Sequence, residues 1–119
     1  MTEIESFAVL YRVLDSIWIE YEGLFDDDFP GLLGDATPSA DGSPMDQALL
    51  EYWQEQSADR DPANPEEGYA AMVDFLKAWR DVGESDTKEI TRVIAILQEN
   101  RDRYVALWSE EVRRSAPSG

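Results

Sequence analysis

The sequence predicts an all-α fold: an antiparallel four-helix bundle with long helices 1 and 4, shorter helices 2 and 3, and a long acidic loop between helices 1 and 2. Apolar residues recur at spacings of three and four in four segments, the periodicity of helices with one buried face. Of the 119 residues, 43% are apolar, including four Trp, five Tyr and four Phe. We therefore expect a single folded domain over residues 1–114, followed by a flexible tail at 115–119.

The first helix is predicted to begin at a capping box formed by Thr2 and Glu5. Its apolar stripe then runs through Ile4, Phe7, Tyr11, Leu14, Trp18, Tyr21 and Phe25. At about 1.5 Å per residue, such a helix is roughly 36 Å long. The breadth of the apolar stripe indicates that this helix contacts more than one neighbouring helix.

Residues 26–43 are predicted to form the long loop. Pro30 and Pro38 stand among three glycines, Gly31, Gly34 and Gly42, and these residue types interrupt regular structure. Connections longer than about 12–15 residues are uncommon in compact domains and often carry function. This loop is therefore the first place to look for a functional surface.

The two short helices share one start signal, a capping residue followed by proline. Helix 2 is predicted to begin at Ser43-Pro44 and to end near Ser57, and helix 3 begins at Asn64-Pro65. The inner face of helix 2 is expected to hold Met45, Leu49, Tyr52 and Trp53. Helix 3 is expected to pack through Tyr69, Met72, Val73, Leu76 and Trp79.

Helix 3 is predicted to stop at Gly83, and helix 4 to run from Asp86 to Arg114 with Glu89 as the capping partner of Asp86. Its stripe is Ile90, Val93, Ile94, Leu97, Tyr104, Val105, Trp108 and Val112. Each predicted helix carries one tryptophan, and we interpret these as core anchors.

Two long and two short helices leave apolar surface uncovered at one end of the bundle. Three apolar loop residues, Phe29, Leu32 and Leu33, are expected to cover this end. A second subunit or a partner protein is the alternative cover.

The charge balance excludes several functions. The net charge is −16, with −12 on residues 1–60 (14 acidic, two basic) and −4 on residues 61–119 (12 acidic, eight basic). Direct binding to nucleic acid or to an anionic membrane is therefore not expected. The chain has neither cysteine nor histidine, so disulfides, thiolate metal sites and histidine-based catalysis are excluded. The acidic N-terminus does not resemble a signal peptide, and a cytoplasmic location is expected.

The aspartates Asp26, Asp27 and Asp28 do not fit a known metal motif. An EF-hand loop aligned from Asp26 places Pro30 at position 5 and Thr37 at position 12, where a bidentate glutamate is required. We predict no metal site and no cofactor.

Two carboxylate pairs, Asp81-Val-Gly-Glu84 and Glu99-Asn-Arg-Asp102, offer a further alternative. They resemble the magnesium-binding pairs of the all-α nucleotide pyrophosphatases of the MazG type, and this resemblance implies a carboxylate-dependent magnesium hydrolase. The stripe of helix 4 places Glu99 and Asp102 on its outer face, whereas catalytic carboxylates should point into the bundle. We therefore predict that the chain is not an enzyme.

The function that the sequence favours is a small protein-interaction module that binds a basic protein surface. The predicted binding residues combine charge with apolar anchors and lie in the loop: Asp26, Asp27, Asp28, Phe29, Leu32, Leu33 and Asp35. In size, charge and helix number the chain is similar to the small acidic immunity proteins that neutralise basic nuclease toxins, and a nucleic-acid mimic is a narrower form of this idea. The alternative is a self-associating structural protein, a homodimer through helices 1 and 4.

Overall fold

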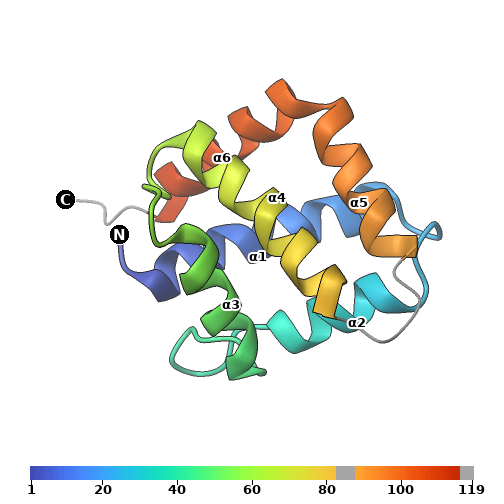
Figure 1. The fold of residues 1–119 in the computed structure, drawn as a ribbon, viewed down its shortest axis with the longest axis horizontal. Helices are drawn as coiled ribbons and strands as arrows, with labels where there is room; N and C mark the ends of the chain where they lie inside the picture. Colours follow the sequence, from blue (N-terminus) through green and yellow to red (C-terminus); the bar gives the residue numbers. More distant parts are fainter. Residues whose placement is uncertain (83–87, 116–119) are drawn as a thin grey trace.

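The fold of the chain is all-helical, as predicted. The structure, a computed structural model, describes residues 1–82 and 88–115. Within these ranges it contains six helices and no β-strand (Figure 1). The helices are α1 (Glu3–Glu20), α2 (Asp28–Ala36), α3 (Gln47–Ser57), α4 (Pro65–Val82), α5 (Lys88–Glu99) and α6 (Arg101–Ser115). No helix in these ranges is long and apolar enough to cross a membrane.

The predicted start of the first helix is confirmed, but its end is not. Glu5 donates its backbone N–H to Thr2 Oγ1 at 3.1 Å, and Thr2 donates its own N–H to the Glu5 carboxylate at 3.2 Å. The helix ends at Glu20 rather than Phe25, because the chain turns at Gly23 with a φ of 91° that favours glycine. This turn returns Phe25 to the core, edge-on to Phe29 at a centroid distance of 4.9 Å.

The prediction of a long loop over residues 26–43 is wrong, because α2 lies within it. The buried residues of α2 are spaced as on a helix: Phe29, Leu32, Leu33 and Ala36. Pro30 is accommodated because it lies in the first turn, where a missing N–H breaks no intrahelical bond. The irregular connection is only 37–46, and it carries an isolated antiparallel bridge between Pro38 and Pro44.

The two helices predicted to be short begin close to their predicted starts, but α4 is not short, because its 18 residues equal those of α1. The cap of α4 is Asn64, whose side-chain oxygen accepts the N–H groups of Glu66 and Glu67 at 3.0 and 3.3 Å. The cap of α3 is Asp46, which accepts the Ala48 N–H at 3.0 Å, so this helix begins three residues later than Pro44. The helix boundaries predicted at Gly83 and Asp86 lie outside the described residues.

The long fourth helix of the prediction is two helices, α5 and α6, separated at Asn100. Asn100 donates its backbone N–H and its side-chain amide to Ile96 O, at 3.1 and 2.9 Å, and its carbonyl accepts the Tyr104 N–H at 3.1 Å. One residue therefore closes α5 and opens α6. The four-helix bundle with its predicted helix lengths is thus replaced by six helices. Of the predicted tail 115–119, Ser115 belongs to α6 and the rest lies outside the described residues.

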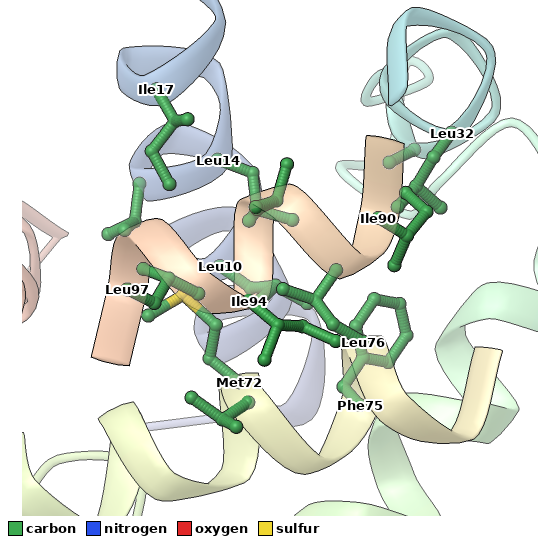
Figure 2. Close-up of a cluster of buried hydrophobic side chains, with 14 of the residues drawn as sticks. Leu10, Leu14, Ile17, Leu32, Met72, Phe75, Leu76, Ile90, Ile94 and Leu97 are labelled. Carbon is green, nitrogen blue, oxygen red and sulfur yellow. The ribbon is translucent and has the colours of Figure 1, made fainter. Parts of the chain in front are cut away.

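The core is formed where α1, α2, α4 and α5 converge (Figure 2). Leu10, Leu14 and Ile17 of α1 meet residues of α4 and α5 there, and Leu32 of α2 lies beside Ile90 at the right of the view. Phe29, Leu32 and Leu33 of α2 are thus part of the core itself.

The four tryptophans are not equivalent anchors. Trp53 and Trp108 are fully buried with ring centroids 5.9 Å apart, whereas Trp18 and Trp79 are only half-buried. Trp53 donates its indole N–H to Ser6 Oγ at 2.9 Å, and Trp108 donates to Pro62 O at 2.7 Å. A Cβ atom at Gly68 would lie 2.1 Å from Trp108 Nε1, so α6 can approach α4 this closely only over a glycine.

Candidate functional site

The strongest chemical feature of the surface is one acidic side, defined here as residues 26–59, which comprise α2, the connection 37–46 and α3. These elements lie along the lower edge of Figure 1, opposite α6. The segment contains no lysine or arginine. Its nine carboxylates are Asp26, Asp27, Asp28, Asp35, Asp41, Asp46, Glu51, Glu55 and Asp59. Every one is exposed except Asp28, which is half-buried.

The aspartates at the start of α2 are held in place by a residue far away in the sequence. The Glu89 carboxylate accepts backbone N–H groups of Asp26 at 3.0 Å, Asp27 at 3.2 Å and Phe29 at 2.9 Å. These N–H groups would otherwise lack helical partners, since α2 has no side-chain cap of its own. Glu89 was predicted to cap its own helix together with Asp86, but in the structure its carboxylate caps α2.

The charge of Glu89 is stabilised by these contacts. Burial raises the pKa of Glu89, but the backbone donors of Phe29, Asp26 and Asp27 together lower it more, so its pKa lies below the ordinary value of 4.5. The carboxylate is therefore ionised at neutral pH. Its negative charge interacts favourably with the positive, N-terminal end of the α2 dipole. The aspartate backbones have a structural role that the sequence did not reveal.

The seven predicted binding residues separate into two groups. Phe29, Leu32 and Leu33 are buried, with at most 6% of Leu33 exposed, and they belong to the core. The four aspartates lie nearer the surface: Asp26, Asp27 and Asp35 are exposed, and Asp28 is half-buried. Three of these aspartates lie at the start of α2 and Asp35 lies in its last turn, whereas the predicted apolar anchors hold α2 against α1 and α5.

Positive charge lies beside the first three aspartates. Lys88 and Arg92 line a hollow of about 310 Å³ together with Leu24, Phe25 and Glu89, next to the start of α2. The potential at Asp26–Asp28 is therefore moderated by two cations. The uncompensated part of the acidic side begins at Asp35 and continues into α3.

The connection 37–46 is ordered by a network around Asp41. Its carboxylate accepts Ser43 Oγ at 2.6 Å, Ser39 Oγ at 2.8 Å and the Ser43 N–H at 3.0 Å. These bonds, with Ser43 Oγ the largest contributor, lower the pKa of Asp41 to about 2. Gly42 has a φ of 88° and allows the tight turn. Asp41 therefore presents a fixed negative charge.

The acidic side is continuous from α2 to α3. The Asp46 N–H donates to Asp35 O at 2.9 Å, which joins the last turn of α2 to the cap of α3. Two exposed carboxylates are thus brought near each other, although they are 11 positions apart in the sequence (46 − 35). The backbone bond fixes both positions, so a partner would meet a preformed array of charge.

The α3 surface offers the apolar contact that the α2 leucines do not. Ala48, Glu51, Tyr52 and Glu55 line a hollow of about 370 Å³, and Met45 nearby is 66% exposed. The sequence placed Met45 and Tyr52 on the inner face of the helix, which is wrong for Met45 and only half correct for Tyr52. The position of Met45 before the Asp46 cap was the signal that it lies outside the helical stripe.

Of the two carboxylate pairs considered for magnesium binding, the structure describes only one completely, Glu99 and Asp102. Glu84 lies outside the described residues. Glu99 ends α5 while Asp102 lies in the first turn of α6, so the break at Asn100 separates a pair that should share one helix. No group of three carboxylates in the described part of the chain is close enough to hold a metal ion.

Comparison with known proteins identifies no relative: no protein-family model, curated protein or solved structure matches this chain.

Proposed function

We propose that this chain is a non-enzymatic interaction module whose acidic side, residues 26–59, binds a basic surface of another protein. The observation that carries the proposal is the separation of charge, with nine carboxylates and no basic residue in this segment. A field of one sign over a rigid surface accelerates encounter with a partner of opposite charge.

The hollow on α3 supports a specific mode of contact. An arginine or lysine side chain can lay its aliphatic part against Ala48 and Tyr52 while its charged end reaches Glu51 or Glu55. Glu51, Glu55 and Tyr52 all line this one hollow. Such a contact combines an ion pair with apolar burial, the combination found at strong interface positions.

An inhibitor or immunity-type protein is the finer form of this proposal. Such a protein binds a basic enzyme surface and blocks its access to anionic substrate. The mimicry of nucleic acid by surface carboxylates is compatible with the same contacts. Both forms predict that binding weakens as salt concentration rises.

The experiment is capture of partners from the protein's own cell extract by immobilised wild-type chain and by two variants. The acidic-side variant carries Asp35→Asn, Asp46→Asn, Glu51→Gln and Glu55→Gln. The control variant carries Asp81→Asn, Glu66→Gln, Glu99→Gln and Asp102→Asn, all exposed and all outside the acidic side. Each removes four negative charges, so both variants carry −12 instead of −16.

We expect a basic protein to be captured by the wild type and the control variant at low salt, and to be lost at about 300 mM salt. The acidic-side variant should retain little of it. Asn remains an effective helix cap at position 46, so the fold is expected to persist. Equal capture by both variants would show that overall charge, rather than the acidic side, governs binding.

A further inference from the structure

The groove between α1 and α6 is a second surface with a different character. Its volume is about 640 Å³, and its floor contains Ile19, Ala106 and Leu107. Ile19 is 65% exposed, although isoleucine is among the residue types most often buried in folded proteins. The groove therefore presents apolar surface that nothing in the described chain covers.

The charges that line this groove are balanced. Two acidic residues, Glu20 and Glu110, alternate with two arginines, Arg103 and Arg113. Two copies of a chain with a net charge of −16 repel each other in most orientations. A groove of zero net charge is where two copies meet with the least repulsion.

The residues along one face of α6 are arranged so that two antiparallel copies of the helix complement each other. Arg103, Ala106, Leu107 and Glu110 follow the spacing i, i+3, i+4 and i+7 and share one face of the helix. If two such helices cross antiparallel about a point between Ala106 and Leu107, the arginine of each copy lies opposite Glu110 of the partner subunit. A two-fold contact makes this match twice.

The ion pairs within each copy extend the match. Arg103 already pairs with Glu20, and Arg114 donates to Glu110 at 2.7 Å. In the two-fold contact, these two ion pairs of one copy meet those of the partner. Acidic and basic side chains then alternate on each side of the apolar centre. The charges remain partly exposed in the single chain, with 53% of the Arg103 side chain and 47% of the Glu110 side chain accessible.

We propose that the α1–α6 groove binds a second copy of this chain in a two-fold antiparallel contact centred on Ala106 and Leu107. Ala106 is small, so the two helices can approach closely at the centre, and Ile19 of each copy then lies against the partner. The proposal is independent of the acidic side, which stays exposed in such a dimer.

Sedimentation equilibrium from micromolar to submillimolar concentration tests the proposal. We expect the wild type to reach twice the chain mass of 13.5 kDa. The variant Ile19→Glu should raise the dissociation constant at least about tenfold, whereas Met45→Glu, at an equally exposed residue on the acidic side, should leave it unchanged. A wild-type monomer throughout, or equal effects of the two variants, would overturn the proposal.

A charge exchange gives a test that a simple folding defect cannot imitate. Arg103→Glu and Glu110→Arg should each dimerise poorly alone, because like charges then face each other across the two-fold axis. When the two variants are mixed, both facing pairs are again of opposite charge, and a mixed dimer should form. Circular dichroism verifies that each variant is folded, and a mixture of folded variants that stays monomeric contradicts the antiparallel register.

Discussion

The acidic side and helix α6 lie at opposite edges of one small fold and use charge in opposite ways. Residues 26–59 hold nine carboxylates and no cation, whereas α6 holds four arginines, one aspartate and two glutamates, a net charge of +1. The arginines Arg101, Arg103 and Arg114 form ion pairs with Glu66, Glu20 and Glu110. Residues 26–59 therefore carry −9 of the net charge of −16, and the remaining residues carry −7.

The acidic side and α6 are also stabilised by different kinds of interaction. The helix α6 is fixed by aromatic packing over Gly68, and the acidic side is fixed by hydrogen bonds to carboxylates, from Glu89 to α2 and from Asp41 to the connection 37–46. Neutralising or protonating carboxylates should therefore loosen the acidic side first. Changes of volume should loosen α6 first.

The largest expected effect is at Gly68. Gly68→Ala places a Cβ atom 2.1 Å from Trp108 Nε1, so the indole or the helix must move. We expect a loss of roughly 3 kcal/mol or more in the free energy of unfolding, measured by urea denaturation. The control is Gly34→Ala in α2, where nothing lies within 4 Å of the new methyl group. It should stabilise the protein by about 0.5–1 kcal/mol through helix propensity, and two equal effects would refute the close contact of α6 with α4.

The next effect is at Glu89. Glu89→Gln replaces a carboxylate that accepts three backbone N–H groups with a neutral amide, and we expect a loss of about 1–2 kcal/mol. Hydrogen exchange should accelerate in α2 before it does in α6. The exposed Glu99→Gln serves as the control, and unchanged exchange in α2 would contradict the cap across the chain.

The same cap predicts a response to acid. Because the folded-state pKa of Glu89 lies below 4.5, the cap contributes its full stability above that pH. This contribution is lost as the pH falls through the folded-state pKa. Melting temperatures of wild type and Glu89→Gln should therefore converge at acid pH, and a constant difference down to pH 2 would argue against a charged cap.

Alkaline pH tests the α6 side in the same way. Burial raises the pKa of Tyr104 to about 12 from an ordinary value of 10. The folded state then keeps a proton that the unfolded chain releases, so stability is unaffected well below pH 10 and falls between pH 10 and about 12. Tyr104→Phe should flatten that part of the profile. If the wild type and Tyr104→Phe lose stability identically between pH 10 and about 12, Tyr104 does not contribute to the alkaline loss.

The smallest expected effect is that of salt on stability. Moderate salt screens repulsion among the carboxylates and should raise the melting temperature near neutral pH. The acidic-side variant should respond less to salt than the control variant of equal charge. A melting temperature that falls with salt in the wild type would contradict the role assigned to repulsion.

The sequence predicted the helical class and several helix starts, because caps such as Thr2 and Asn64 act on residues only a few positions away. It did not predict α2, although Phe29, Leu32, Leu33 and Ala36 have helical spacing, because Pro30, Gly31 and Gly34 are residue types that usually interrupt a helix. The break at Asn100 left no trace in the stripe, because Leu97 and Tyr104 are seven residues apart and match an unbroken helix.

Four of the nine carboxylates of the acidic side were predicted as binding residues, namely Asp26, Asp27, Asp28 and Asp35, and the predicted apolar anchors lie in the core. The composition of residues 26–35 was sufficient to locate exposed aspartates. The contact between Glu89 and Phe29 spans 60 positions, and no local spacing reveals such a pair. The α3 hollow depends on which side of Tyr52 remains uncovered after packing, and this is decided by the neighbouring helices.

The most direct test of the account is a hydrogen-exchange footprint of the chain with its purified captured partner. We expect slower exchange in the complex across residues 35–59, with little change across 101–115. Protection confined to α6, with residues 35–59 unchanged, would contradict the assignment of binding to the acidic side.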